Sequence, residues 1–272
     1  MELDEPLVEA ERGPLTVEQA IANLRHEDLS LRYYAAWWLG KFRVRDAAAV
    51  TALIVALQDN SDRTALGGYP LRRNAARALG KLGDRQAVPE LIRCLDCNDF
   101  YVREAAAQAL GALGDPVCIP HLLHFLEGGV AAAQLVPGQP HLVEPYEAVI
   151  EALGDLGATA AIEVIQPFVD HSIARVRYSA TRALYQLTQN SEYAERLVQA
   201  LQGGDVQSRR TVLSDLGAIG YVPAAEAIAT AGVENGFKIL ALKGLLESQL
   251  RLNSGDLSDR AVQVMSLMDN LL

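Results

Sequence analysis

The sequence predicts an all-α fold, an α-solenoid (superhelix) of about seven helical-hairpin repeats. The first observation is a stretch that recurs along the chain, most clearly at residues 99–115, DFYVREAAAQALGALGD. The second is a leucine seven places after a basic residue in nearly every copy. The third is helical spacing of apolar residues without the two-residue alternation typical of strands. Such units bury their apolar faces only against their neighbours, so the repeat organises the whole chain.

The recurring leucine sets the register of the repeats. The seven leucines are Leu39, Leu79, Leu110, Leu153, Leu184, Leu216 and Leu245. They follow a period of about 31 residues with two longer intervals, which indicates two insertions. Only the fourth copy lacks the basic residue and has Tyr146 in its place. We expect each copy to be the second helix of a hairpin.

One solenoid is expected to span residues 1–272, with a flexible lead at 1–14. The first helix begins at Thr16, because Gln19 completes a capping box, and the second runs from about residue 31 to residue 42. In the later units, first helices are expected at 50–58, 88–95, 119–126, 160–169, 193–201 and 223–231. Residues 253–272 carry a capping helix from Ser258 that is unusually apolar. A partner subunit or the seventh unit is expected to cover it.

The units resemble HEAT-type repeats. A D-x-x-V-R arrangement occupies residues 99–103, and an alanine-rich helix ending L-G-x-L-G follows. Small residues let neighbouring helices pack closely. In HEAT-like repeats the equivalent arginine commonly bonds an acidic side chain of an adjacent unit. We therefore predict a structural ladder rather than ligand contacts for the register arginines, which are Arg32, Arg72, Arg103, Arg177 and Arg209.

The two insertions, residues 60–70 and 128–145, both fall between the first and second helix of a unit. Because both insertions occupy the same place in the topology of their units, we expect them on the same rim of the solenoid. Loops added at one edge of a repeat stack are often binding loops. Extra surface length is also tolerated at little energetic cost, so both interpretations stay open.

Composition excludes several classes of function. The formal net charge is −10 and the isoelectric point about 5.0, which argues against general binding to nucleic acid or anionic membranes, because both rely on basic side chains. The acidic N-terminus does not resemble a signal peptide, and no apolar run is long enough to span a membrane. We expect a cytoplasmic protein without nucleic-acid or membrane partners.

Three cysteines and two histidines have a spacing that suggests zinc, with Cys94, Cys97 and Cys118 followed by His121 and His124. The repeat register argues against a metal site. It places Cys94 at a core position and both histidines on the outer face, so the donors do not converge. We therefore predict structural cysteines, no metal, and a reducing compartment.

Two places on each second helix, the one after the basic residue and the one four further on, share one face. They hold Tyr33 and Trp37, Arg73 and Arg77, Glu104 and Gln108, Glu147 and Glu151, Tyr178 and Arg182, Arg210 and Ser214, Ile239 and Lys243. Arginine beside aromatic rings suits a flat conjugated ligand with carboxylates; a solvated groove wall is the simpler alternative. No nucleophile–base pair or phosphate loop is visible, so any activity must rest on positioning and protection.

Several stretches resemble the E subunit of the E/F-type phycobilin lyases of cyanobacteria, and among them the lyases that serve α-phycocyanin. They are residues 33–42, YYAAWWLGKF, 69–84, YPLRRNAARALGKLGD, 102–115, and the PYEAVIEALGDLG block. The resemblance covers nearly the full chain, and the paired aromatics at 33–34 and 37–38 are its most specific part. It implies a heterodimer with a homologous F-type subunit. It also implies that phycocyanobilin, a substrate rather than a cofactor, is attached through a thioether to a cysteine of the phycocyanin α subunit.

On this resemblance the stripe residues receive hypothetical bilin-binding roles. Arg73 and Arg77 would hold propionates, Tyr33 and Trp37 would pack against pyrrole rings, and Glu147 or Glu151 would accept hydrogen bonds from pyrrole N–H groups. The nucleophile belongs to the acceptor protein, so no catalytic residue is assigned in this chain. By holding and shielding the pigment, the lyase would direct the addition.

Two other functions stay open from the sequence. One is a lyase-isomerase subunit serving phycoerythrocyanin, because the histidine–cysteine chemistry of that group is associated with its F subunit. The other is a HEAT-repeat adaptor that binds protein and no pigment.

Overall fold

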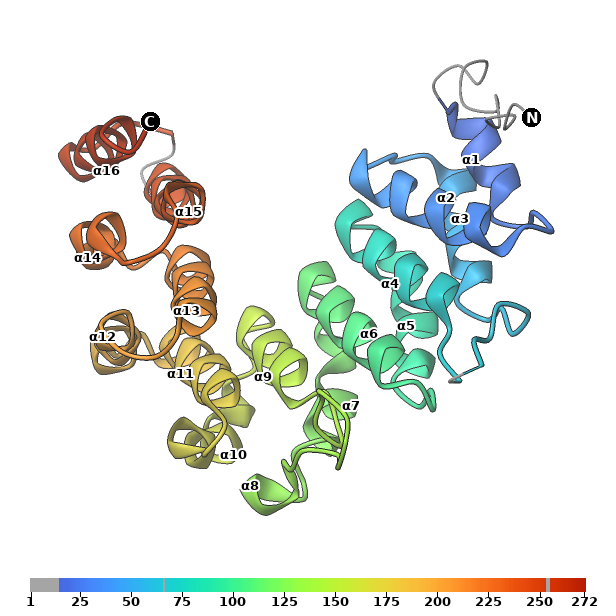
Figure 1. Ribbon diagram of the computed structural model, residues 1–272, viewed down its shortest axis with the longest axis horizontal. Helices are drawn as coiled ribbons and strands as arrows, with labels where there is room; N and C mark the ends of the chain where they lie inside the picture. Colours follow the sequence, from blue (N-terminus) through green and yellow to red (C-terminus); the bar gives the residue numbers. More distant parts are fainter. Residues whose placement is uncertain (1–14, 66, 253–254) are drawn as a thin grey trace, which may run out of the picture. The chain divides into compact units, whose positions relative to one another are not determined.

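The computed structural model describes residues 15–65, 67–252 and 255–272. Helices dominate these residues, and their β pairing is limited to an isolated bridge between Leu135 and Leu142, so the all-α prediction is confirmed (Figure 1). None of the helices in these ranges has the length and hydropathy to cross a membrane. The chain divides into two compact units, Met1–Leu113 and Gly114–Leu272. The predicted lead at 1–14 lies outside the described residues, and one continuous solenoid stays a prediction.

The first unit consists of three helical hairpins. Its helices are α1 (Val17–Asn23), α2 (Leu29–Lys41), α3 (Ala47–Ala56), α4 (Pro70–Leu82), α5 (Val88–Cys94) and α6 (Phe100–Leu113). The second helices α2, α4 and α6 lie side by side in one layer (Figure 1). The first helices α1, α3 and α5 each pack against the second helix of their own hairpin.

The second unit continues the same pattern. Its helices are α7 (Ile119–His124), α8 (Gly129–Ala132), α9 (Tyr146–Asp155), α10 (Ile162–Ile165), α11 (Ala174–Thr188), α12 (Ser191–Ala200), α13 (Val206–Ile219), α14 (Ala225–Thr230), α15 (Asn235–Leu252) and α16 (Asp259–Asp269). Here the second helices are α9, α11, α13 and α15, and each packs against the next (Figure 1). Short α8 belongs to the second insertion.

Helix ends follow side-chain capping. Thr16 and Gln19 form the predicted capping box. The second helix begins earlier than predicted, because the Asp28 carboxylate accepts a hydrogen bond from the Ser30 N–H at 2.8 Å. The helix predicted at 160–169 is wrong in its second half, which is a 3₁₀ segment, Gln166–Asp170. Pro167 explains the change, since its ring removes a backbone donor from the helix interior.

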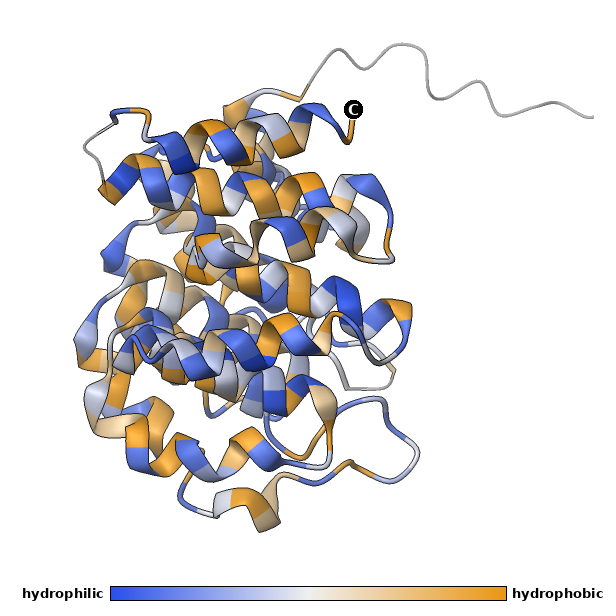
Figure 2. Ribbon diagram, turned by 90° about the vertical axis from the view of Figure 1, so that its left-hand side faces the viewer, coloured by the Kyte–Doolittle hydropathy of each residue, from blue (hydrophilic) through white to orange (hydrophobic). Residues whose placement is uncertain are grey.

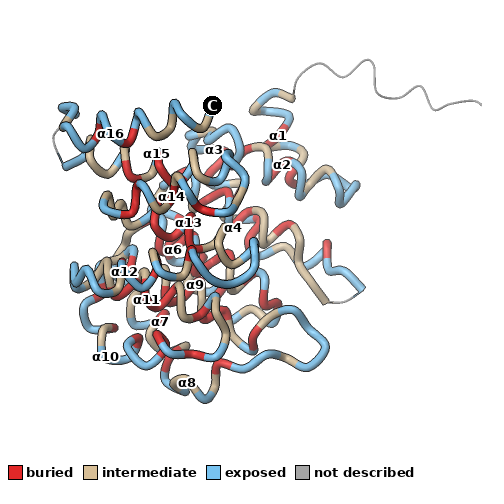
Figure 3. The backbone as a smooth tube through the Cα atoms, turned by 60° about the vertical axis from the view of Figure 1, so that its left-hand side comes forward, coloured by how far each residue is buried: buried red, intermediate tan, exposed pale blue. Residues whose placement is uncertain are grey.

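The register leucines form the centre of the core. All seven have 0% exposure, and buried residues concentrate where helices face one another (Figure 3). The same helices alternate hydrophobic and hydrophilic residues along their length (Figure 2), as expected for elements with one buried face. Tyr146, which replaces the basic residue in the fourth copy, is also buried and packs near the Phe168 ring.

Neighbouring second helices touch through glycine and alanine. A Cβ added to Gly40 on α2 would lie 2.8 Å from the Ala78 Cα on α4, and one added to Gly80 would lie 2.9 Å from the Ala109 Cα on α6. The second unit repeats this contact between Gly154 and Ala183. The glycine follows the register leucine and the alanine precedes it, so one position per repeat sets the approach of the helices.

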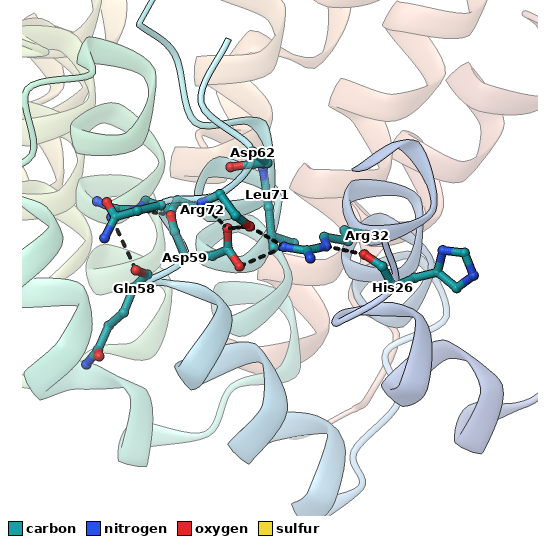
Figure 4. Close-up of polar contacts among 9 residues, drawn as sticks. His26, Arg32, Gln58, Asp59, Asp62, Leu71 and Arg72 are labelled. Carbon is teal, nitrogen blue, oxygen red and sulfur yellow. Dashed lines mark hydrogen bonds and ion pairs between the residues drawn. The ribbon is translucent and has the colours of Figure 1, made fainter. Parts of the chain in front are cut away.

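The arginine ladder is structural, but the predicted partner is wrong for most of its members. Arg32 does bond an acidic side chain of the next unit, the Asp59 carboxylate at 2.9 Å; it also bonds the His26 carbonyl (Figure 4). Arg72 instead donates to the carbonyl oxygens of Asp59 at 2.6 Å and Gln58 at 3.3 Å (Figure 4). These carbonyls end the first helix of its own unit, where backbone acceptors lack helical donors.

The other ladder arginines act in the same way. Arg103 donates to the Cys97 carbonyl at 2.7 Å, Arg177 to that of His171 at 2.7 Å, and Arg209 to that of Gly204 at 3.0 Å. Each arginine therefore ties the second helix of a hairpin to the turn that precedes it. These hydrogen bonds fix the angle between the two helices of a hairpin.

Both insertions lie between a first and a second helix, as predicted. In the first, the Asp62 carboxylate accepts from the Leu71 N–H at 2.6 Å (Figure 4), so the loop caps α4. In the second, backbone hydrogen bonds flank the Leu135–Leu142 bridge, and the Leu142 side chain is buried. Each insertion is thus fastened to its unit, and their common rim stays a prediction.

The C-terminal helix α16 packs on the seventh hairpin. This was one of the two explanations predicted for its apolar character. Ser258 caps it, and Val264 is buried in the core of α13 to α15. Met268 and Leu271 pack against that core, while Val262 stays 49% exposed. Folding back therefore covers one face of α16.

A polar cluster joins three second helices in the second unit. The Arg182 guanidinium on α11 pairs with Glu151 at 3.4 Å and Asp155 at 3.0 Å, both on α9, and with Asp215 on α13 at 3.6 Å. Asp215 is only 3% exposed, and one of its carboxylate oxygens has no hydrogen-bond partner. Burial first, and the Glu151 charge second, raise the pKa of Asp215 to about 7.

We predict that Gly80→Ala destabilises the protein by about 1–2 kcal/mol, because the methyl group meets the Ala109 backbone and the steric cost exceeds the gain in helix propensity. Gly236→Ala is the matched control, since no atom lies within 4 Å of its added Cβ. The measurement is urea denaturation followed by circular dichroism. Equal stability of both variants would show that the contact between α4 and α6 is not tight.

We predict a pH-dependent effect of Asp215→Asn. The folded-state pKa of about 7 lies above the ordinary 3.8, so the stability from this group is full below about pH 4 and is lost as the pH rises to about 7. The variant should therefore gain stability relative to the wild type between about pH 5 and about pH 8. Arg182 keeps two other carboxylates. Urea denaturation of both proteins at about pH 5 and about pH 8 tests this. Asp170→Asn is the control, because the Asp170 side chain is exposed. The prediction is contradicted if the difference in unfolding free energy between the wild type and Asp215→Asn is the same at both pH values.

Candidate functional site

The first unit presents aromatic rings on the face of its second helices. Tyr33 and Trp37 on α2 are 43% and 44% exposed, and the Tyr34 ring stacks on that of Trp37 with 5.5 Å between centroids. The Asn74 side-chain amide on α4 donates to the Tyr33 carbonyl at 3.1 Å. This bond ties the aromatic helix α2 to α4, which carries the two predicted arginines.

The two arginines differ in their charge balance. The Arg77 guanidinium lies 3.7 Å from the Glu104 carboxylate on α6. The Arg73 side chain has neither an ion pair nor a hydrogen bond within the described residues; its guanidinium carbon lies 5.8 Å from the centroid of the Tyr101 ring. An arginine without an acidic partner attracts a carboxylate, so Arg73 is the stronger anion-binding candidate.

The predicted acids Glu147 and Glu151 lie on α9, which belongs to the second unit. The other four predicted residues belong to the first unit. Glu147 pairs with Arg175 on α11. Glu151 pairs with Arg182 and accepts a hydrogen bond from the Ser179 hydroxyl at 2.7 Å. Both carboxylates therefore already have cationic partners, and their role as acceptors for pyrrole N–H groups stays a prediction.

Sequence reasoning missed one row of residues on this face. Tyr101 lies under Arg73, and Arg175 pairs with Glu147 and also donates to the Pro140 carbonyl of the second insertion at 3.3 Å. Both residues stand two places before the register arginine. That place is three residues before the first stripe position, so helical spacing puts the two positions on the same face of the helix. Helical spacing alone could therefore have identified these residues.

The two stripe residues expected on α15, Ile239 and Lys243, do not line a groove. A groove between α13 and α15 is lined instead by Phe237, Leu240 and Gly244 from α15. On α13 the expected Arg210 and Ser214 do line it. Leu245 is nevertheless fully buried, so the seventh copy keeps its register and a different side of α15 lines the groove.

The cysteines and histidines do not gather. Within the described ranges, no group of three or more His, Cys, Asp or Glu side chains is placed to hold a metal ion. Burial raises the pKa of Cys94 to about 12 and that of Cys118 to about 11, so both remain neutral thiols in the core. His124 is exposed and pairs with Glu127.

These surfaces suit binding more than bond-breaking chemistry. The first unit combines exposed rings with an unneutralised guanidinium, and the second adds carboxylates held by arginines. Rings provide flat apolar contact and guanidinium groups pair with acids. The surface of the first unit can by itself hold and orient a flat molecule that carries carboxylates.

Two family models match the chain. The model described as HEAT repeats matches residues 69–133. The model described as PBS lyase HEAT-like repeat matches residues 31–59, 145–171 and 176–203. These segments fall in both units, so the predicted repeat class is confirmed.

Curated relatives are similar over almost the whole chain. The phycocyanobilin lyase subunit alpha of Nostoc sp. (strain PCC 7120) is 64% identical over 274 residues, which cover 98% of this chain and 99% of the relative. The protein of the same name from Thermosynechococcus vestitus is 66% identical over 243 residues, 87% of this chain and 88% of its own length. The bilin biosynthesis protein PecE of the same Nostoc strain is 45% identical over 259 residues, covering 95% and 96%.

A solved structure agrees with these relatives. It is the complex of CpcE and CpcF of phycocyanin lyase from Nostoc sp. PCC7120, in which the matching chain superimposes with a TM-score of 0.89 at 61% identity over 100% of both chains. Fold, repeat type and sequence thus agree along the full length. The chain belongs to the family of phycocyanobilin lyase alpha subunits.

Proposed function

We propose that this chain is the E-type, alpha subunit of a heterodimeric phycobilin lyase that attaches phycocyanobilin through a thioether to a cysteine of the phycocyanin α subunit. Its partner is a homologous F-type subunit, as CpcF is for CpcE in the related complex. The observation that carries the proposal is the full-length similarity to subunits with this activity. A pigment-free adaptor does not account for that similarity.

A lyase-isomerase role is the second candidate, and sequence identity favours the lyase. In a single Nostoc strain, the phycocyanobilin lyase subunit is 64% identical to this chain and PecE is 45% identical. Both cover at least 95% of the chain. The chain therefore follows the lyase branch throughout its length rather than in one segment.

The reaction needs positioning rather than an acid or nucleophile from this chain. The acceptor thiol adds across the exocyclic double bond of the pigment: a carbon–sulfur bond forms, a proton joins the neighbouring ring carbon, and no oxidant is consumed. A thiol in free solution can attack from either face. A lyase that fixes the pigment and excludes stray thiols and water selects one product. We propose no cofactor, because phycocyanobilin is the substrate.

The face of α2, α4 and α6 supports a specific arrangement of the pigment. Trp37 and Tyr33 expose their rings for stacking on pyrroles, and Arg73 offers an unneutralised guanidinium to a propionate. Arg77 would do so by exchanging its 3.7 Å contact with Glu104. On the second unit, considered by itself, Glu147 and Glu151 are proposed to accept pyrrole N–H groups alongside their arginine partners.

The first test is reconstitution. Co-expression of this chain, an F-type subunit, the phycocyanin α subunit and the enzymes of bilin synthesis should give a covalently coloured α subunit on a denaturing gel. Omitting this chain should remove the colour. Covalent colour at the same level without it would disprove the lyase function, and a blue-shifted denatured product would indicate the isomerase.

The second test addresses the bilin-binding residues. In complexes that stay assembled, Trp37→Ala and Arg73→Ala should each slow attachment about tenfold, through lost ring contact and a lost charged hydrogen bond. Arg77→Ala should have a smaller effect, because Glu104 partly neutralises it. Arg93→Ala on α5 is the control: its side chain is 72% exposed and pairs with Glu90. Wild-type rates for all variants would exclude this face.

A further inference from the structure

A groove with a volume of about 450 Å³ lies between α13 and α15 in the second unit. The two helices approach so closely that a Cβ on Gly244 would strike the Gly217 carbonyl, and one on Gly217 would lie 3.0 Å from the Ala241 Cα. Backbone and methyl groups therefore form the floor. The volume falls in the range of small-molecule sites, about 300–1,000 Å³.

The walls of the groove carry exposed apolar side chains. Leu240 is 66% exposed and Phe237 41% exposed, and both line the groove from α15. They stand one helical turn apart on the same face. Large apolar side chains that point into a hollow gain free energy when a ligand covers them. The floor and walls together favour a flat, largely apolar ligand.

Among the described residues that line the groove, one of the two arginines has no acidic partner. Arg210 is neutralised by Glu234, with 3.0 Å between its Nε and a carboxylate oxygen, and its guanidinium lies over the Phe237 ring at 4.9 Å. Glu247 pairs with Lys243 at 3.7 Å. Arg251 has no acidic partner among the residues that the structure describes. The groove thus offers an unneutralised guanidinium at the end of an apolar hollow, which suits a carboxylate.

We propose that this groove is a second contact site for the bilin: pyrrole rings lie on the glycine floor against Phe237 and Leu240, and a propionate pairs with Arg251. The inference rests on the proposed lyase function, because the bilin is the flat, acid-bearing molecule of that reaction. The Ser214 hydroxyl lines the same groove and is placed to bond a polar edge of a ring. The site belongs to the second unit alone and includes none of the six residues assigned from the sequence.

The experiment is absorption titration of phycocyanobilin into the purified complex of the full chain with its F-type subunit. Leu240→Ser and Arg251→Gln should each weaken binding about tenfold, the first by lost apolar contact and the second by a lost charged hydrogen bond. Leu252→Ser is the matched control on the same helix, because Leu252 is 75% exposed and does not line the groove. Arg260→Gln on α16 is the control for charge.

The outcomes separate this proposal from the lyase function. Wild-type affinity in both groove variants overturns the groove site while the lyase function stands. Loss of the F-type subunit from either variant in size-exclusion chromatography also overturns it, because the groove is then a protein-docking surface. A wild-type complex that neither binds nor attaches the pigment rejects both proposals. Arg251→Gln alters an exposed side chain, so it remains informative if Leu240→Ser unfolds the protein.

Discussion

The close contact between neighbouring second helices is the constraint on which the structure depends. In four helix pairs a glycine after the register leucine meets the backbone of an alanine on the next helix, as Gly40 meets Ala78 and Gly154 meets Ala183. A larger side chain would collide with that backbone, so these helices pack closely. This spacing brings side chains from successive helices close enough to act together on a ligand.

The exposed face of these helices is organised by charge balance. Several arginines on this face pair with acids, as Arg175 does with Glu147 and Arg182 with Glu151. Two arginines without an acidic partner among the described residues are therefore informative. Arg73 lies beside exposed aromatic rings, and Arg251 lies beside an apolar groove. Each combines a flat apolar surface with a free guanidinium, which is the chemistry that a tetrapyrrole with propionates requires.

The register arginines show how a correct role was predicted with the wrong partner. Periodicity showed that Arg72, Arg177 and Arg209 recur in a structural position. Their acceptors are carbonyl oxygens in the turn that precedes the second helix. Every residue has a carbonyl, so no side chain in the sequence indicates this partner. The structural ladder is therefore predictable from the sequence, whereas its bonding is not.

The sequence by itself determined the repeat class, the seven buried leucines, the capping box at Thr16 and the face of the second helices that carries the candidate site. These features depend on local periodicity, which is visible in one dimension. Only the tertiary structure decided which charges are neutralised, that Arg73 and Arg251 have no acidic partner among the described residues, and that Phe237 and Leu240 line the groove on α15. Such pairings join residues of different helices, and their distances arise only when the rows are packed.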